Sequence, residues 1–238
     1  MLTQARQVIS VIDADPELAA VLDGDELALA RRHAVAAAFA LPKGPVGELP
    51  EPDGDDAQRY GLLILDGLMM RELDIAGRQT AELLGRGDLI RPWDEDPLDP
   101  LPGEVRWSVT VPARVAALDR RFAAVAGRFP ALQEVLASRI DARARLLGLQ
   151  RALAQIPRVD ARVLVLLWRL ADRWGHVTTE GVQLPIPLTH DTVAKLVGAR
   201  RPSVTTAVGV LIERGLVERG RGGYTLHGDP AAALPAML

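Results

Sequence analysis

The sequence of 238 residues contains no cysteine, which excludes disulfide bonds, cysteine-ligated iron–sulfur clusters and thiol redox switches. It has no apolar run long enough to span a membrane, and acidic residues follow its N-terminus where a signal peptide would be basic. Its only lysines are Lys43 and Lys195, so arginine carries nearly all of the positive charge. From these absences we expect a cytoplasmic protein that does not associate with a membrane.

Charge is distributed unevenly along the chain. The formal net charge is −3, but residues 139–238 contain 14 basic and 8 acidic side chains, so the acidic excess lies entirely in residues 1–138. An acidic first part joined to a basic second part is typical of a sensor domain followed by a nucleic-acid-binding domain. The length is sufficient for two domains with independent cores.

A segment near the C-terminus predicts two helices separated by a tight turn. Thr189 is a suitable N-cap for a helix over residues 190–197, and Gly198 can adopt the positive φ that ends it. Pro202 predicts the start of a second helix, because its fixed φ suits a first helical turn. The same proline should hold Arg201 outside the α region.

The second of these helices has an apolar side and a polar side. Val204, Val208 and Leu211 follow the i, i+4, i+7 spacing of a buried stripe. The opposite side carries hydroxyl groups, and arginines stand at its N-terminal tip. Such a surface suits the DNA major groove, where arginine can bind guanine and hydroxyls can reach bases or phosphates. The predicted DNA-contacting residues of the two helices are Thr189, His190, Arg200, Arg201, Ser203, Thr205 and Thr206.

A glycine-rich hairpin is predicted after the second helix. Residues 216–219 and 224–226 are expected to be its strands, with Arg219 and Arg221 placed for phosphate contacts. Together these features predict a winged helix-turn-helix that binds double-stranded DNA. The alternative is an α-helical hairpin that only packs within the protein. The arginines at the helix tip and in the hairpin favour DNA binding.

The first part of the chain predicts one helical segment followed by a β-rich unit. Residues 14–41 are expected to be helical because they have an alanine-rich body, and residues 42–57 to be a loop rich in proline, glycine and acid. Short strands separated by turn residues indicate an all-β unit, with a further loop over residues 91–103. The expected strands are 60–65, 68–70, 72–75, 80–84, 89–90, 105–111 and 113–118.

A long amphipathic helix is expected from Pro130 to about Ile156, ended by Pro157. Its approximate heptad stripe has two interpretations, a helix that covers a domain face or the seam of a two-stranded dimer. We favour the dimer, which would place two winged helices side by side. After it, Asp160 is expected to cap a helix over residues 163–174, and residues 182–188 to form a short strand. The stripe consists of Leu132, Val135/Leu136, Arg139/Ile140, Arg143, Leu146/Leu147, Gln150 and Leu153.

The order of these parts resembles the Crp/Fnr (catabolite activator) family of bacterial transcription regulators. The resemblance is carried by Val115–Asp119 with Phe122 and Phe129-Pro130, by the Val-Asp-Ala-Arg hinge at residues 159–162, by Leu188-Thr189 and Val193–Gly198, and by Arg200–Val204. It is strongest over residues 112–228, and residues 1–57 hardly resemble the family. It implies an α+β fold: an N-terminal cyclic-nucleotide-binding-like β-barrel (jelly roll) with flanking helices, a long dimerisation helix and a C-terminal winged helix-turn-helix.

The resemblance also implies four parts and individual roles. The parts are a sensor domain (residues 1–129), the dimerisation helix (130–157), the DNA-binding domain (158–230) and a tail (231–238). In the recognition helix Arg201 would contact guanine, Ser203 and Thr189 would contact phosphates, and Thr206 would be a second base-facing position. The family often has Glu or Gln in place of Pro202 and Arg in place of Thr206, so the operator of this chain should differ.

The chain departs from the family at the cyclic-nucleotide site. Relatives that bind cyclic nucleotides carry Gly-Glu-Leu after a Gly-Asp turn and then Arg-Ser or Arg-Thr, whereas here Gly87–Ile90 is followed by Arg91-Pro92-Trp93. The nearest candidate for the phosphate-binding arginine is Arg106, which lies beside Glu104. The long helix has Leu147-Gly148 where the family offers hydroxyl groups to adenine. We therefore expect that cyclic AMP and cyclic GMP do not bind and that any effector is another small molecule.

The sequence gives no indication of an enzyme, a cofactor or a metal site. It contains no phosphate-binding glycine loop followed by lysine and no serine-centred elbow, and its four histidines lack metal-ligand spacing. Haem held by His33 with Met69 or Met70 is a weaker alternative. We expect a dimeric, sequence-specific transcription regulator, with RNA polymerase as a candidate partner. The alternative function is a DNA-packaging or architectural protein that uses the same fold without promoter specificity.

Overall fold

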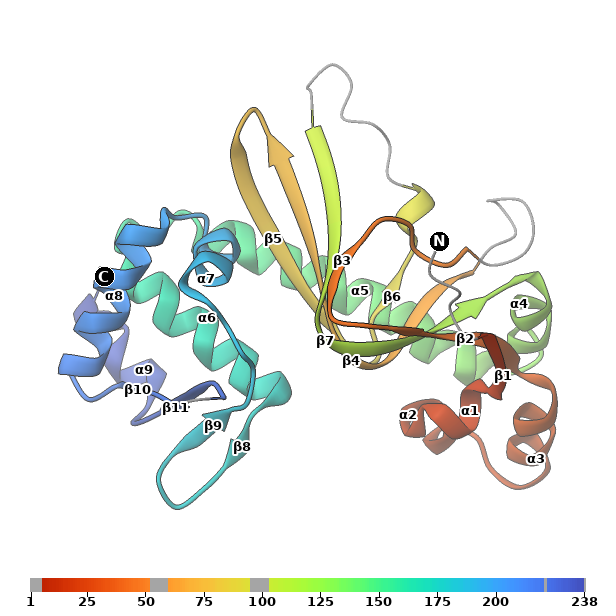
Figure 1. The fold of residues 1–238 in the computed structure, drawn as a ribbon. Coiled ribbons are helices and arrows are strands. Elements are labelled where there is room, and N and C mark those ends of the chain that lie inside the picture. Colours follow the sequence, from red (N-terminus) through yellow and green to blue (C-terminus); the bar gives the residue numbers. More distant parts are fainter. Residues whose placement is uncertain (1–5, 52–59, 95–102, 221, 238) are drawn as a thin grey trace. The chain divides into compact units, whose positions relative to one another are not determined.

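The computed structural model describes residues 6–51, 60–94, 103–220 and 222–237. The chain has an α+β fold and divides into two compact units, one formed by residues 1–76 and 83–145 and the other by residues 77–82 and 146–238. The long helix α5 (Pro130–Leu153) contributes residues to both units (Figure 1). Among the described residues, no helix is both long and apolar enough to cross a membrane.

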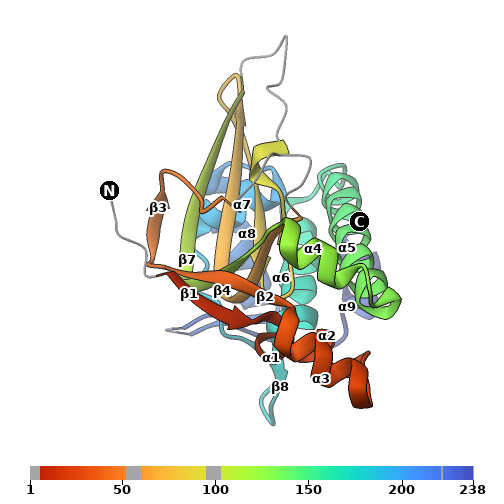
Figure 2. The same ribbon diagram turned by 90° about the vertical axis from the view of Figure 1, so that its right-hand side faces the viewer.

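The first unit is built on a seven-stranded sheet in which β7 occupies a central place. The strand order is β1-β2-β7-β4-β5, with β3 also paired to β7 and β6 to β4. β7 pairs antiparallel with β2, β3 and β4, and Figures 1 and 2 show the long strands β4 and β7 running side by side. The strands are β1 (Arg6–Ser10), β2 (Val35–Leu41), β3 (Gly44–Val46), β4 (Gly61–Ile75), β5 (Arg78–Gly85), β6 (Leu89–Ile90) and β7 (Gly103–Leu118).

The helices that follow β1 and those that follow β7 pack together in this unit. Phe122 of α4 and Leu132 and Leu136 of α5 are fully buried in a single apolar cluster together with Ile12 and Leu18 from the N-terminal helices. The first half of α5 is therefore part of the core of this unit. The helices are α1 (Val11–Ala14), α2 (Pro16–Ala20), α3 (Gly24–His33) and α4 (Arg120–Ala126), and a 3-10 turn, η2, covers Pro92–Asp94.

The prediction of one helix over residues 14–41 is wrong for its last part, because residues 35–41 form strand β2. Ala36, Ala38 and Leu41 are buried, in near alternation with more exposed residues, and the strand pairs with β1 on one side and β7 on the other. Alanine favours helix in isolation, but here ladder hydrogen bonds and packing against the sheet outweigh that preference. The rest of the segment forms three short helices.

The three short strands expected over residues 60–75 are one continuous strand, β4, and the two expected over residues 105–118 are one strand, β7. The register between them shifts around Gly67, which has a φ of 79°. A Cβ on Gly67 would overlap the carbonyl oxygen of Pro112. The turn residues that suggested breaks therefore mark an irregularity within the long antiparallel pair of β4 and β7, where a glycine and a proline can be accommodated.

The predicted loops contain short regular elements. β3 lies within the expected loop 42–57, and η2 lies within the expected loop 91–103; residues 52–59 and 95–102 of these loops are outside the described part of the chain. Elements of only three residues, such as β3 and η2, carry almost no periodicity, which is why the sequence pattern does not reveal them.

After the end of α5, the described part of the second unit contains four helices, a 3-10 turn and a four-stranded antiparallel sheet in the order β10-β11-β9-β8. Its core combines one face of α6 with buried residues of α7 and α8. The elements are α6 (Val159–Trp174), β8 (His176–Val177), β9 (Val182–Leu184), α7 (His190–Val197), α8 (Arg201–Glu213), β10 (Val217–Arg219), β11 (Tyr224–Leu226), α9 (Pro230–Ala233) and the turn η3 (Pro235–Met237).

The prediction that Asp160 caps α6 is wrong, because the helix begins at Val159 and its N-cap is Arg158. Asp160 instead accepts hydrogen bonds from the Arg158 guanidinium, at 2.6 and 3.2 Å, and from the backbone N–H of Ala161. Burial would raise the pKa of Asp160, but these hydrogen bonds outweigh it and lower the pKa. The carboxylate thus stabilises the first turn from inside the helix.

Gly223 permits a close approach between the hairpin β10–β11 and β9. A Cβ at this position would overlap the carbonyl oxygen of Leu184, whereas a Cβ on Gly222 would meet nothing within 4 Å. We expect Gly223→Ala to lower the free energy of unfolding by about 1–3 kcal/mol, because the two strands must separate to admit the methyl group. Gly222→Ala is the matched control and should leave it nearly unchanged. Urea unfolding of both variants measures the difference, and equal midpoints would contradict the close approach.

Candidate nucleic-acid interface

The helix-turn-helix has the local geometry that its sequence predicts. Thr189 is the N-cap of α7, where its Oγ1 accepts a hydrogen bond from the backbone N–H of Thr192 at 3.0 Å. Gly198 ends the helix in the left-handed conformation, with φ 63° and ψ 44°. A side chain is strained in that conformation, so glycine allows the chain to turn at once toward α8.

α8 begins one residue earlier than predicted. Arg201 is its first residue, and Arg200 is the N-cap with extended backbone angles, φ −85° and ψ 144°. The prediction that Pro202 holds Arg201 outside the α region is therefore wrong. A proline disfavours the α conformation of the residue before it but does not forbid it. Val204, on the same helix, is fully buried. Both arginines are therefore placed at the N-terminal end of α8.

The two faces of α8 are divided as the spacing predicts. Val204, Val208 and Leu211 are at most 3% exposed, while the arginines and hydroxyl residues lie on the exposed side. The Thr205 hydroxyl donates to the carbonyl oxygen of Arg201 at 3.1 Å, and the Thr206 hydroxyl contacts that of Pro202 at 3.3 Å. These bonds fix the rotamers of the two threonines. The exposed residues of this face are Arg201, Ser203, Thr205 and Thr206.

Positive charge at the tip of α8 is not neutralised within the described residues. Arg200 and Arg201 are exposed and make no ion pair with a described residue, unlike Arg158 or Arg139. The N-terminal end of a helix adds its own partial positive charge and its free N–H groups. The tip therefore offers guanidinium groups and backbone donors to an anionic partner.

Arg162 forms hydrogen bonds with the C-terminal end of α7. The sequence pattern identified this residue only as part of the hinge motif. Its guanidinium donates to the carbonyl oxygens of Val197 and Gly198, at 3.3 Å each, and to that of Ile156. The last carbonyls of a helix lack intrahelical partners, so a basic side chain at this place satisfies them. A basic residue within the hinge is the only sequence signal for this role.

His190 connects three elements of the interface. Its Nδ1 lies 2.9 Å from Oγ1 of Thr205 on α8, and its Nε2 lies 3.2 Å from Nη1 of Arg219 on β10. Burial lowers the pKa of His190, and the positive charges of Arg219 and Arg201 lower it further. Three of the predicted contact residues, from α7, α8 and the wing, thus meet at one point.

The wing consists of β10, β11 and the turn between them. Its strands pair as predicted, with Val217 opposite Leu226 and Arg219 opposite Tyr224. The predicted contact residue Arg221 lies outside the described residues. Arg219 faces His190 at the base of the recognition helix, so it belongs to the same surface as the helix tip.

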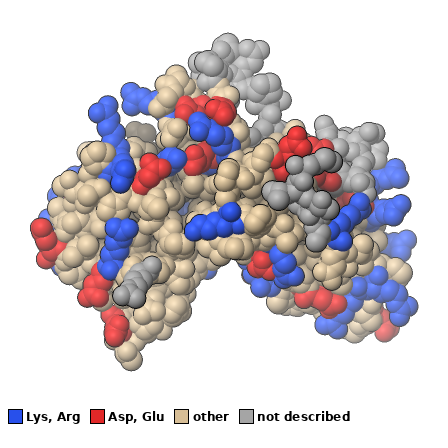
Figure 3. Space-filling model, in the orientation of Figure 1, with Lys and Arg blue, Asp and Glu red and all other residues tan. Residues whose placement is uncertain are grey.

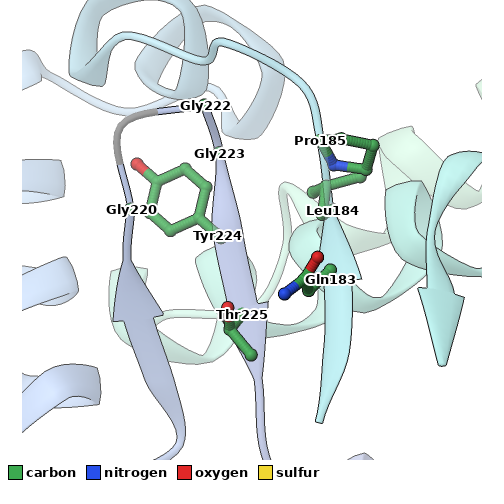
Figure 4. A pocket seen from close by; sticks show the side chains of 8 residues that line it. All are labelled: Gln183, Leu184, Pro185, Gly220, Gly222, Gly223, Tyr224 and Thr225. Carbon is green, nitrogen blue, oxygen red and sulfur yellow. The ribbon is translucent and has the colours of Figure 1, made fainter. Parts of the chain in front are cut away.

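A pocket of about 210 Å3 lies beside the wing, between the Tyr224 ring and the segment Gln183–Pro185 (Figure 4). Tyr224 is 3% exposed, and burial raises the pKa of its hydroxyl. Ligand pockets usually measure about 300–1,000 Å3, so this hollow is smaller than a typical small-molecule site. It is a feature of how the wing packs on β9.

The predicted alternative haem ligands have different surroundings. His33 is exposed at the end of α3, whereas Met69 is fully buried among the aliphatic residues of the sheet. The described residues contain no group of three or more His, Asp or Glu side chains that could hold a metal ion. Nothing in this arrangement supports the haem interpretation.

Basic side chains do not form one continuous field on the face drawn in Figure 3, where blue and red side chains are interspersed.

Comparison with known proteins agrees with this geometry. Residues 161–231 match the family model of the Crp-like helix-turn-helix domain. A comparison with curated proteins gave no match.

Solved structures of similar fold cover nearly the whole chain. FixK2 from Bradyrhizobium japonicum has a TM-score of 0.62 at 14% identity, covering 85% of this chain and 96% of its own. A CooA mutant from Carboxydothermus hydrogenoformans has a TM-score of 0.62 at 16% identity, covering 84% and 87%. CLP from Xanthomonas campestris, described as a cyclic di-GMP responsive global regulator, has a TM-score of 0.60 at 15% identity, covering 87% and 100%.

The C-terminal domain is of a DNA-binding class. Residues 161–231 therefore form a Crp-like helix-turn-helix domain, and the fold of the chain is similar to that of solved bacterial regulators such as FixK2 and CLP.

Proposed function

We propose that this regulator binds a specific operator as a homodimer and that its N-terminal domain does not respond to cyclic AMP or cyclic GMP. Binding to DNA is proposed from the exposed N-terminal tip of α8. Arg200 and Arg201 lie there and form no ion pair with a described residue, while Val204 on the same helix is fully buried. A rigid helix with unpaired guanidinium groups at its end matches the depth and the acceptor pattern of the major groove.

Individual roles follow from the hydrogen bonds of the exposed face. Arg201 is proposed to bind guanine, and Arg200, Ser203 and Thr189 to bind phosphates. Because Thr205 and Thr206 direct their hydroxyls to helix carbonyls, they retain lone pairs and can accept hydrogen bonds from base amino groups. Arg219 of the wing would complete the phosphate contacts, and the same role for Arg221, outside the described residues, stays a prediction from the sequence.

Selection of binding sites from random duplexes, followed by footprinting, tests this function. A sequence-specific regulator enriches one inverted repeat and protects it over a limited stretch. The alternative, a DNA-packaging protein, would protect all sequences about equally. Enrichment of no sequence at moderate salt would contradict the proposal and support packaging.

A dimer seam on α5 cannot use every residue of the heptad stripe that the sequence predicts. Leu132 and Leu136 are buried inside the chain's own core, and the Gln150 amide donates to the carbonyl oxygens of Ala81 and Leu196. These residues are therefore committed within the chain. Only the part of the stripe that lies outside these contacts can serve a second copy.

Arg139 likewise makes its contacts within its own unit. Its guanidinium, with 9% of the side chain exposed, binds Asp15 through two hydrogen bonds of 2.6 and 3.0 Å and Glu17 through one of 2.9 Å. The pKa of Arg139 is raised, because the two carboxylates outweigh its burial. Arg139, which is part of the predicted heptad stripe, is therefore not available to the proposed seam.

The exposed face of α5 carries its own apolar heptad pattern. Ala137, Ile140, Ala144 and Leu147 follow at intervals of three, four and three residues and are all exposed, Ile140 by 48% and Leu147 by 41%. This spacing is that of the a and d positions of a two-stranded coiled coil. We propose that these residues pair with the same residues of a second copy, so that two recognition helices lie about 34 Å apart on the DNA.

The proposal that the N-terminal domain lacks a cyclic-nucleotide site is supported by two observations. Arg106 is engaged by the carboxylates of Asp74, at 3.4 Å, and Glu104, at 3.3 Å. The buried cluster of the sheet is aliphatic, with Leu62, Ile64 and Met69 fully buried. A phosphate needs an unopposed cation and polar donors, and neither Arg106 nor this cluster offers them.

Calorimetric titration of the dimer with cyclic AMP and cyclic GMP should therefore give no binding heat, and operator affinity should be the same with and without either nucleotide. Cyclic di-GMP is a necessary third ligand, because CLP responds to it. Micromolar binding of cyclic AMP or cyclic GMP would contradict the proposal. Binding of cyclic di-GMP alone would support it and would identify the effector.

A further inference from the structure

The imidazole of His190 lies within a chain of hydrogen bonds that joins the wing to the recognition helix. It links Arg219 of β10, His190 at the start of α7, and Thr205 and the carbonyl of Arg201 on α8, with distances of 3.2, 2.9 and 3.1 Å. These four groups are separated by up to 29 positions in the sequence. No base or phosphate is needed to bring them together.

The direction of each hydrogen bond follows from the chemistry of the groups. A guanidinium can only donate, so Nε2 of His190 must accept from Arg219 and must carry no proton. The ring proton then lies on Nδ1 and is donated to the Thr205 hydroxyl, which donates in turn to the Arg201 carbonyl. The arrangement therefore requires a neutral imidazole in one of its two tautomers.

The charges around the ring favour that neutral form. Arg219 faces it from β10 and Arg201 from α8, and both are cations. Asp191, the acid next to it in the sequence, is paired with Lys195 at 3.2 Å. The N-terminal end of α7 also disfavours a positive charge at its first residue.

We propose that neutral His190 is a positioning residue for DNA binding, which holds the guanidinium of Arg219 and the hydroxyl of Thr205 so that wing and recognition helix form one rigid surface. This role rests on the proposed DNA-contact surface. Arg219 uses one of its five N–H donors for His190, and the others stay available for a phosphate. Holding a long side chain in place before binding reduces the entropy that it loses on the DNA.

Lowering the pH should break the contact of His190 with Arg219 but not its contact with Thr205. Protonation of Nε2 removes the acceptor for Arg219 and places a third cation beside Arg219 and Arg201. The donor at Nδ1 remains, so the contact with Thr205 persists. The energetic coupling between His190 and Arg219 should therefore exist at alkaline pH and disappear as the ring is protonated.

Two substitutions separate the two contacts. In His190→Asn the side-chain amide can replace Nδ1 and retain Thr205, but it cannot reach Arg219. In His190→Gln the longer amide can replace Nε2 and keep an acceptor for Arg219. Each is combined with Arg219→Gln, and operator affinity is measured at one salt concentration at pH 8 and pH 5.5.

At pH 8 the effects of His190→Asn and Arg219→Gln should be non-additive by about 2- to 10-fold in Kd, the range of one typical intramolecular hydrogen bond. His190→Gln should lose much less affinity than His190→Asn. At pH 5.5 the coupling should vanish. Additive effects at pH 8, or a coupling that persists unchanged at pH 5.5, would overturn the positioning role.

A measurement without DNA separates this inference from the proposed surface. The 15N shifts of the His190 ring in the free protein should identify the tautomer protonated at Nδ1, and the other tautomer would overturn the proposal. If Arg201→Ala leaves operator binding unchanged, the proposed surface itself is wrong. If Arg201→Ala abolishes specific binding while His190 and Arg219 act additively, the surface stands and only the positioning role fails.

Discussion

Replacing Arg201 with alanine should lower the affinity for the operator by about 5- to 150-fold and leave binding to unrelated DNA much less affected. A bidentate contact between arginine and guanine contributes about 1–3 kcal/mol of discrimination against other bases. Arg201 is the first residue of α8 and is exposed, and no described residue forms an ion pair with it. The lost free energy should therefore appear in the ratio of specific to non-specific affinity.

Two further arginines serve as controls for this experiment. Arg200→Ala removes a predicted phosphate contact, so it should weaken binding to all sequences alike and reduce the salt dependence by about one unit of slope. Arg214→Ala removes the same charge from the other end of α8, where the side chain is exposed, and should change little. If Arg201→Ala keeps the sequence preference of the parent protein, α8 does not read the bases.

The second large effect is expected for Leu147→Glu, which should convert the dimer to monomers at micromolar concentration. The substitution places like charges on both sides of the proposed seam, at the larger of the two exposed apolar side chains nearest its C-terminal end. A monomer binds a single half-site and loses the advantage of two linked contacts, which is on the order of 100- to 10,000-fold in affinity. Analytical ultracentrifugation and binding to the inverted repeat measure the two consequences.

Leu149→Glu is the matched control, because Leu149 is 53% exposed on the same helix but lies away from the stripe of Ile140 and Leu147. It should remain dimeric and bind the operator normally. Dissociation caused equally by both substitutions would argue against this register. A parent protein that sediments as a monomer would rule out the seam altogether.

The sequence by itself determined the winged helix-turn-helix, since its signals act over short distances. The cap at Thr189, the left-handed Gly198 and the stripe of Val204, Val208 and Leu211 are confirmed with errors of a single residue. Caps and helical periodicity depend on neighbours within one or two turns. The resemblance to the Crp/Fnr family is confirmed by the family model for the helix-turn-helix domain and by solved structures for the fold.

Only the tertiary structure decided the features that depend on partners far away in the sequence. The alanines of residues 35–41 become a strand because β1 and β7 supply hydrogen bonds that no local pattern announces. The heptad stripe of α5 had two interpretations, a cover for a domain face or a dimer seam, and only the structure shows that Leu136 is buried within its own unit and that Arg139 pairs there with Asp15. The contacts of His190 likewise join residues that are distant in sequence, so a single sequence could name them as candidates but could not place them side by side.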